Sequence, residues 1–288
     1  MPLSLQVDTF LLKIIKYLPS GRFFAIRQCQ QARFMEFKEI LEHHILDKVW
    51  AYLDIGPVRL PISKHLLMMC IAFILLTVVL PFIIKSRSKI IAPLRSMIEV
   101  IVIFIRDEVV RPNLGKEKGD RHLPYFSTLF FFILTMNLLG LVPYGATATG
   151  NLAVSGALAL TSLVFILFLG IRTQGFFTYI KNMVPHGVPV WLYPIMFPIE
   201  LIGLVTKSFA LCVRLFANMI GGHIVILSFI CFIFIFGSLG AIYGFGVAPV
   251  SVFLVLFMMA LELFVAFLQA YIFVFLTAIF TGMAVNPH

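Results

Sequence analysis

Single polar residues interrupt the last hundred residues of the chain, which are otherwise apolar. The stretch CVRLFANMIGGH, residues 212–223, contains one arginine and one histidine. After Arg214, the next charged residue is Glu262. A charged side chain at the centre of a bilayer costs roughly 2.5–3.5 kcal/mol on insertion scales, and such residues commonly mark proton or ion pathways. We therefore take these residues as candidates for moving a proton or an ion.

A stripe of polar and small residues runs along the segment that contains Arg214. Glu200, Lys207, Arg214 and Gly221 follow one another at intervals of seven residues. Seven residues make nearly two helical turns, so the four share one helix face that drifts by about 20° per step. Asn218, one turn after Arg214, joins this face. The spacing predicts a helix with one polar face.

A second group of polar residues follows a glycine-rich segment. Residues 237–249 contain several glycines and end in Pro249, which predicts a turn between two helices. With Tyr243 as the midpoint, His223 lies 20 residues before the turn and Glu262 lies 19 residues after it. In an antiparallel hairpin these two side chains are neighbours, so they form one predicted cluster.

The same hairpin predicts a second polar cluster. Gln269 lies seven residues after Glu262, and the register brings it close to Arg214 and Asn218. Arg214 and His223 are about 13 Å apart along the helix axis and point to opposite faces. The two clusters are therefore distinct.

Structural explanations of these residues stay open at the level of the sequence. Arg214 can form a buried salt bridge with an acidic residue. Glu200 and Lys207 can lie near the membrane interface, where a charge is tolerated. Gly221 and Gly222 can simply permit close packing of helices.

The composition places the whole chain in a membrane. Of its 288 residues, 61% are hydrophobic and 12% are charged, and the mean hydropathy is +1.04. A soluble domain has no use for so much apolar surface, so we predict an all-α polytopic membrane protein. The formal net charge is +9, with the basic excess in the first half, outside the long apolar segments. Because no basic face on a soluble fold is visible, nucleic acid is not an expected partner.

Apolar segments long enough for a bilayer core of about 30 Å define a membrane domain at residues 66–288. Three upright spans are predicted at 66–84, 125–142 and 152–171. Residues 85–122 form a basic loop that contains a short interfacial helix. The positive-inside rule places this loop in the cytoplasm.

The last two helices are too long to be upright spans. They are predicted at residues 194–236 and 251–283, and each is about 50 Å long or more at 1.5 Å per residue. An upright helix needs only about 30 Å. We expect no proline to interrupt either helix, so both should lie steeply tilted in the membrane rather than broken. Such a hairpin presents a long face to a partner.

The N-terminal segment, residues 1–65, is amphipathic and typical of a helix that lies on a membrane surface. The orientation above places it outside, but its own basic residues leave the positive-inside rule ambiguous here. The adjacent His43 and His44 would point about 100° apart on a helix and would rarely share one ion. We therefore expect no metal site, and no cofactor.

Three motifs together resemble one family. CVRLFANMIGGH, LELFVAFLQAYIFVFLTAIF (residues 261–280) and MNLLGLVP (residues 136–143), with Glu200 upstream, are similar to subunit a of the F-type ATP synthase. The resemblance covers about residues 89–288. It implies a non-catalytic stator subunit whose tilted hairpin faces a rotating ring of small hairpin subunits, the c-ring. Each ring subunit carries a carboxyl group at mid-membrane.

The resemblance also implies a role for Arg214, which matches the family's essential arginine. In the family this residue faces the ring between two aqueous half-channels and attracts each arriving carboxylate. Arginine suits this role because it stays protonated, with a pKa above about 12. A desolvated lysine can lose its proton and let protons leak between the channels.

Further matches follow residue by residue. Glu200 matches a position in the cytoplasmic half-channel, and His223 and Glu262 match the pair of the outer half-channel. In some bacterial members the acid comes first and the histidine second; here the two are exchanged, as in mitochondrial relatives. Asn218 and Gln269 match polar positions near the arginine. The stripe residue Lys207, together with the glycine pair at 221 and 222, can support this machinery.

The partners implied are the c-ring, the peripheral-stalk subunit b, the rest of the ATP synthase and membrane lipid. The implied location is a bacterial plasma membrane, with the mitochondrial inner membrane as the alternative, and the implied coupling ion is the proton. Competing classes are less consistent with the sequence. It has no H-E-x-x-H motif of a zinc protease, and no internal repeat of the kind common in secondary transporters is evident.

Overall fold

The computed structural model describes residues 49–55, 58–86, 88–142, 148–182 and 193–285. The predicted N-terminal surface helix, with His43 and His44, lies outside the described residues. The described part begins with a short β-hairpin and continues as a series of helices to residue 285.

A two-stranded antiparallel hairpin precedes the first membrane helix. β1 (Val49–Ile55) pairs with β2 (Val58–Ser63), and Ile55 lies opposite Val58 at the turn. The strands contain several β-branched and aromatic residues, which favour extended structure. The prediction for residues 1–65 did not include this hairpin, because runs this short are compatible with helix or strand.

The first membrane helix follows the hairpin without a break. It consists of α3 (Lys64–Ile74), the π-helical segment η1 (Leu75–Val79) and α4 (Leu80–Lys85). Together they cover the span predicted at 66–84.

The basic loop predicted at 85–122 is largely helical. α5 (Ala92–Phe104), the π-helical segment η2 (Ile105–Val110) and α6 (Arg111–Leu114) follow one another. Gly115 then separates α6 from the next helix with a φ of 82°, a conformation that glycine adopts without strain.

Two further membrane helices follow. α7 (Lys116–Leu141) begins nine residues before the predicted start at 125, because the polar residues after Gly115 already belong to the helix. The 3₁₀ turn η3 (Ala148–Gly150) leads to α8 (Leu152–Gln174). Asn151 caps α8 by accepting a hydrogen bond from the N–H of Ala153 at 2.9 Å. The short helix α9 (Phe176–Asn182) comes after α8.

Two long helices form a hairpin at the end of the chain. α10 (Tyr193–Leu239) has 47 residues and α11 (Ala241–Val285) has 45. Gly240 alone separates them, with a φ of 154°. The turn is thus much shorter than the predicted segment 237–249, and the helices extend beyond the predicted bounds of 194–236 and 251–283.

The glycines near this turn were predicted to form a loop, but in the structure they permit close packing of the two helices. A Cβ on Gly244 would lie 2.8 Å from the Cα of Gly237, so the two backbones approach closely there. Pro198 and Pro249 lie inside α10 and α11. The expectation that no proline lies within these helices is therefore wrong. Each proline is close to the N-terminal end of its helix and removes only one backbone hydrogen bond.

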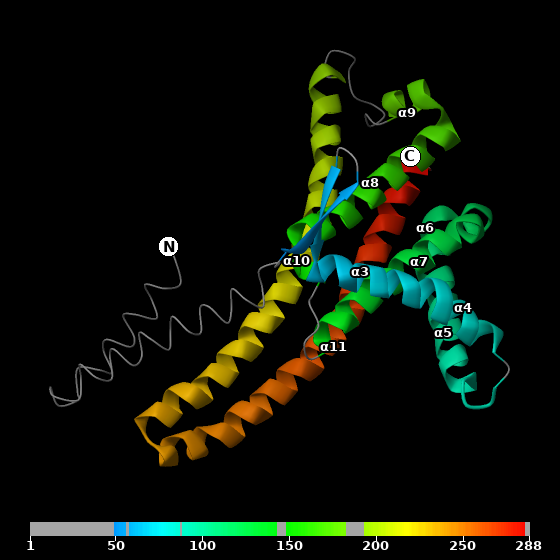
Figure 1. Cartoon of the computed structure of the whole chain (residues 1–288). Coiled ribbons are helices and arrows are strands. Elements are labelled where there is room, and N and C mark those ends of the chain that lie inside the picture. Colours follow the sequence, from blue (N-terminus) through cyan, green and yellow to red (C-terminus); the bar gives the residue numbers. More distant parts are fainter. Residues whose placement is uncertain (1–48, 56–57, 87, 143–147, 183–192, 286–288) are drawn as a thin grey trace.

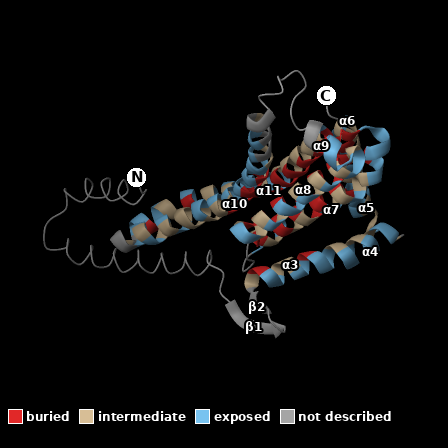
Figure 2. Ribbon diagram, turned by 90° about the horizontal axis from the view of Figure 1, so that it is seen from above, coloured by how far each residue is buried: buried red, intermediate tan, exposed pale blue. Residues whose placement is uncertain are grey.

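Within the described residues, five helices are long and apolar enough to cross a membrane. The chain is accordingly an all-α polytopic membrane protein, as predicted, apart from the β-hairpin. α7, α8 and α11 pack together with part of α10, while the turn end of the α10–α11 hairpin projects away from the other helices (Figures 1 and 2). Large buried side chains fill the shared core, among them Phe126, Phe130, Leu211, Leu215 and Phe273.

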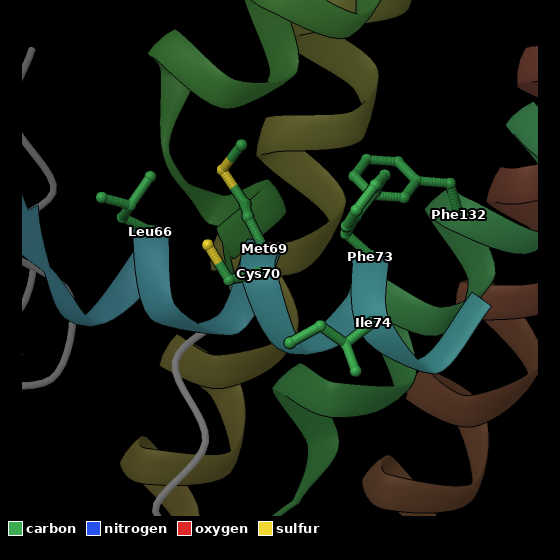
Figure 3. Close-up of a pocket in the computed structure, with 6 residues that line it drawn as sticks. All are labelled: Leu66, Met69, Cys70, Phe73, Ile74 and Phe132. Carbon is green, nitrogen blue, oxygen red and sulfur yellow. The ribbon is translucent and has the colours of Figure 1, made fainter. Parts of the chain in front are cut away.

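An apolar groove lies between α3 and α7, with a volume of about 370 Å³. Figure 3 shows its lining, which comes from α3 and from Phe132 of α7. The lining residues carry no ionisable side chain besides the thiol of Cys70. This groove is therefore not the place where the polar residues of the sequence gather.

Candidate functional site

The α10–α11 hairpin brings His223 and Glu262 together, as the sequence predicted. Nδ1 of His223 lies 2.8 Å from Oε1 of Glu262. The His223 side chain is 28% exposed, whereas the Glu262 side chain is 3% exposed. One partner is thus open to the surroundings and the other is enclosed. A proton can lie on either group across this short hydrogen bond, so the pair can accept a proton at the surface and pass it inward.

Gly222 creates the space for the Glu262 carboxyl group. A Cβ at this position would lie 2.7 Å from Oε1 and 2.8 Å from Cδ of Glu262. The neighbouring Gly221 is exposed, and its Cβ would meet nothing within 4 Å. The two glycines therefore differ: Gly222 shapes the polar cluster, whereas Gly221 leaves an open surface.

One oxygen of the Glu262 carboxyl group has no partner in the described part of the chain. Oε2 is buried and accepts no hydrogen bond there. A buried carboxylate oxygen without a donor is costly. The arrangement therefore calls for a hydrogen-bond donor from beyond the described residues, such as water.

A second polar contact lies five to seven residues further from the turn. Nδ2 of Asn218 donates to Oε1 of Gln269 at 2.9 Å. Gln269 is 2% exposed, and its Nε2 is buried without a partner in the described residues. The predicted cluster of Arg214, Asn218 and Gln269 is thus formed only in part. Its two amides meet, while no hydrogen bond joins Gln269 to Arg214.

Arg214 lies on the exposed face of α10. Within the described residues it has no ion pair and no hydrogen bond, so the salt-bridge explanation has no support there. Leu211 and Leu215, which flank Arg214 on one side of the helix, are 1% and 0% exposed. Arg214 therefore lies on a surface of α10 that the other described residues leave uncovered, next to the covered side.

The uncovered side of α10 carries several of the residues that the sevenfold spacing singled out. Lys207, Arg214, Asn218 and Gly221 are all exposed. The Lys207 ammonium lies 5.2 Å from the ring centroid of Phe280 on α11, a cation–π contact. Glu200 belongs to α10, but its side chain is not among those described.

A third helix contributes to the site, and the sequence reasoning did not assign its residues. The backbone of Gly140 on α7 interacts with the His223 ring. Three residues earlier, Asn137 is fully buried and donates from Nδ2 to the carbonyl of Ala266 on α11 at 3.2 Å. Asn137 could have been recognised in the sequence as an amide side chain at a core position of an otherwise apolar helix.

A separate charge network lies between η2, α6 and the start of α7. Arg111 donates to Asp107 at 2.8 Å and to Asp120 at 2.8 and 2.9 Å. Arg106 also donates to Asp107 at 2.9 Å. The hydrogen bond from Arg106 holds the pKa of Asp107 below its usual range. This network ties α6 to α7 and lies apart from the hairpin clusters. In the described residues, no group of three or more His, Cys, Asp or Glu side chains could hold a metal ion.

The fold and these clusters define a polytopic membrane protein with ionisable side chains within its candidate spanning helices. A model of the ATP synthase A chain family matches residues 66–282. Because this match covers most of the sequence, the chain belongs to the ATP synthase A chain family.

Individual relatives agree with this assignment. The ATP synthase subunit a of Myxococcus xanthus (strain DK1622) is 48% identical over 234 residues, which cover 80% of this chain and 75% of that protein. The subunit a of Chloroherpeton thalassium (strain ATCC 35110 / GB-78) is 42% identical over 238 residues, 81% of this chain and 69% of that protein. That of Anaeromyxobacter dehalogenans (strain 2CP-C) is 42% identical over 240 residues, 82% of this chain and 61% of that protein.

Proposed function

We propose that the chain is the proton-translocating stator subunit of an F-type ATP synthase. It forms two aqueous half-channels that load and unload the carboxyl groups of a rotating c-ring, which couples proton flow to rotation and to ATP synthesis. The subunit itself carries out no chemistry on ATP. Its membership of the ATP synthase A chain family supports this proposal.

The single observation that carries the proposal is Arg214, which is exposed on α10 and has no ion pair or hydrogen bond within the described residues. A permanent cation in a membrane helix is costly unless an opposite charge or water reaches it. A ring of mid-membrane carboxylates that passes this face supplies that charge transiently. The guanidinium attracts each carboxylate, which favours release of its proton, and it transmits no proton itself.

The remaining polar residues take roles on either side of Arg214. His223 and Glu262 form the inner end of the outer half-channel, because one is half-exposed and the other is enclosed. Glu200 belongs to the cytoplasmic half-channel. Asn218 and Gln269 hydrogen-bond each other near the arginine without adding charge.

The proposed partners are the c-ring on the face of Lys207 and Arg214, the peripheral-stalk subunit b, the rest of the synthase and membrane lipid. We place the complex in a bacterial plasma membrane, with the hairpin steeply tilted and the loop before α7 in the cytoplasm. The mitochondrial inner membrane is the alternative location. The named relatives above come from bacteria, which supports the first.

Disulfide cross-linking tests the central contact of this proposal. The four native cysteines are replaced by serine, and one cysteine is placed in the c-subunit next to its carboxyl group. Gly221→Cys, on the open surface, should cross-link to the ring under mild oxidation. Met219→Cys, at a position that is 2% exposed, is the matched control and should not. Cross-linking of the control alone, or of neither in an assembled complex, would place the ring elsewhere.

A further inference from the structure

α7 presents a buried stripe to the rest of the molecule, and one member of that stripe is polar. Phe126, Phe130, Ile133, Asn137 and Gly140 are all buried and follow at intervals of four and three residues. This is the spacing of one helix face. In such a face an apolar residue would pack without further requirements, whereas a buried amide needs partners for its N–H groups and its oxygen.

Asn137 has partners at both ends of its amide. Nδ2 donates to the carbonyl of Ala266 on α11 at 3.2 Å, and Oδ1 accepts from the hydroxyl of Thr149 at 3.0 Å. The Ser155 hydroxyl donates in turn to the carbonyl of Thr149 at 2.6 Å. The side chains of Asn137, Thr149 and Ser155 are each 0% exposed. A hydrogen-bond chain therefore runs from α8 through η3 and α7 to α11.

The hydrogen-bond chain ends one helical turn from the His223–Glu262 pair. Ala266 follows Glu262 by four residues on α11. Gly140 follows Asn137 by three residues on α7, and its backbone interacts with the His223 ring. The same stretch of α7 thus contacts the helix that carries the acid and the ring of the histidine.

Apolar contacts also join α7 and α11 near this point. The rings of Phe130 and Phe267, for example, meet edge to face with centroids 5.6 Å apart. Apolar contacts hold two helices together but tolerate small axial shifts, because they have little directional preference. A hydrogen bond weakens steeply when its length or angle changes. The Asn137 amide is therefore the group best suited to fix the axial position of α11 against α7.

We propose that Asn137 is a positioning residue for the His223–Glu262 pair. Its hydrogen bond to Ala266 sets the height of α11 so that the Glu262 carboxyl group meets the His223 ring beside Gly140. Thr149 fixes the orientation of the amide. This inference rests on the proposed function, in which the pair carries protons.

The environment of the pair leaves few other groups to set its titration. On α7 and α8 the charged residues of the described segments lie more than 14 residues from Asn137 and Ser155 along their helices. On α10 the nearest charge is Arg214, nine residues before His223, and Glu262 is the only charged residue of α11. His65 of α3 is the remaining buried imidazole in the described chain. A change in the geometry of the pair should therefore appear in its own pH profile.

The test compares assembled complexes in membrane vesicles. Asn137→Leu keeps the side-chain size and removes both hydrogen bonds. We expect it to lower proton uptake about three- to fifteen-fold, the change that one interhelical hydrogen bond in a bilayer produces in an equilibrium. We also expect the dependence of uptake on external pH to shift by about half a unit or more. Thr277→Val is the matched control, because Thr277 is equally buried but its hydroxyl donates to the carbonyl of Phe273 on its own helix.

Two further variants complete the design. Thr149→Val leaves the bond to Ala266 but frees the amide oxygen, so it should shift the pH profile less. In the double variant with Asn137→Leu, Thr149→Val should add little to the shift of the pH profile, because both substitutions break the same hydrogen-bond chain. If Asn137→Leu does not assemble, Thr149→Val decides the question by the same pH profile.

The outcomes separate this inference from the proposed function. Glu262→Gln, measured in parallel, tests the role of the pair itself. If Glu262→Gln slows uptake while Asn137→Leu and Thr149→Val keep the parental pH profile, Asn137 does not position the pair. If Glu262→Gln leaves uptake unchanged, the role proposed for the pair is wrong, and the inference about Asn137 is overturned with it.

Discussion

At the scale of single residues, charge compensation distinguishes the two cations of the polar stripe. Lys207 lies over the ring of Phe280, so part of its charge is stabilised within the chain. Arg214 has no comparable partner in the described residues. Among the described residues nothing stabilises its charge, and water or another molecule can do so. A fixed arginine that faces a passing carboxylate is stabilised in this way without trapping the carboxylate permanently.

Gly222 gives a prediction with a matched control one residue away. Gly222→Ala places a Cβ within 2.7 Å of the Glu262 carboxyl oxygen, so the carboxyl group must move. Overpacking of this kind costs about 1–3 kcal/mol, and we expect proton uptake to fall about ten-fold. Gly221→Ala meets nothing within 4 Å in this chain and should lower the rate less than Gly222→Ala does. Equal rates for the two variants, measured in vesicles per assembled complex, would show that the Glu262 position is not critical.

Gln269 gives a prediction about charge near the arginine. Gln269→Glu can still accept the Asn218 hydrogen bond, but it adds a buried carboxylate that competes with the ring for Arg214. Gln269→Asn keeps an amide and adds no charge. We expect Gln269→Glu to impair coupled proton transport more than Gln269→Asn does, with both complexes assembled. A Gln269→Glu complex that pumps at the parental rate would show that the amide does not tune the arginine.

At the scale of elements, the α10–α11 turn sets which residues meet across the hairpin. The two observed pairs, His223 with Glu262 and Asn218 with Gln269, are both centred between residues 242 and 244. The midpoint inferred from the sequence at Tyr243 is therefore confirmed. The glycines around the break are enough to locate that midpoint, although they do not predict the length of the turn.

Gly244 provides a prediction for this element. Gly244→Ala brings a Cβ to 2.8 Å from the Cα of Gly237, and a backbone atom cannot move aside as a side-chain end can. The helix ends should separate, which should lower the free energy of unfolding by about 1–3 kcal/mol and with it the unfolding temperature. Gly246→Ala, where nothing lies within 4 Å, is the control. Identical unfolding temperatures of the two purified variants would contradict the close approach at the turn.

Other features of the elements could not be predicted from the sequence. The helix that contains Pro249 was expected to begin after this proline, at residue 251, because proline usually disrupts a helix interior. In the structure α11 begins ten residues earlier, at Ala241. The contact of Asn218 rather than Arg214 with Gln269 depends on side-chain direction, which sevenfold spacing does not determine. The link between Asn137 and Ala266 joins residues 129 positions apart, and no local pattern records such a pairing.

At the scale of the whole molecule, the hairpin is held at one end and on one side. Near the C-terminal end of α11, a Cβ on Gly282 would lie 2.5 Å from the carbonyl oxygen of Asn113, and Gln174 donates to the carbonyl of Ala284 at 2.7 Å. The turn end projects beyond the other helices (Figure 2). No other part of the described chain covers the face with Arg214. This is the shape expected of a rigid stator that offers one long face to a moving partner.

The sequence alone was sufficient for the class of protein, the approximate positions of the long helices and the His223–Glu262 contact. These depend on hydropathy, on helix length and on counting from a turn, all of which are local properties. The uncovered side of α10 needed the structure, because burial on the other side comes from helices distant in the sequence.

The most direct test of the account is ATP-driven proton pumping by complexes with Arg214→Ala, measured in membrane vesicles and normalised to assembled complex. The account predicts that pumping falls to the background of vesicles without the complex, because no fixed charge then separates the two half-channels or attracts the ring carboxylates. Arg214→Lys should also pump poorly, since a desolvated ammonium can lose its proton. Pumping by Arg214→Ala at close to the parental rate would contradict the role assigned to this arginine.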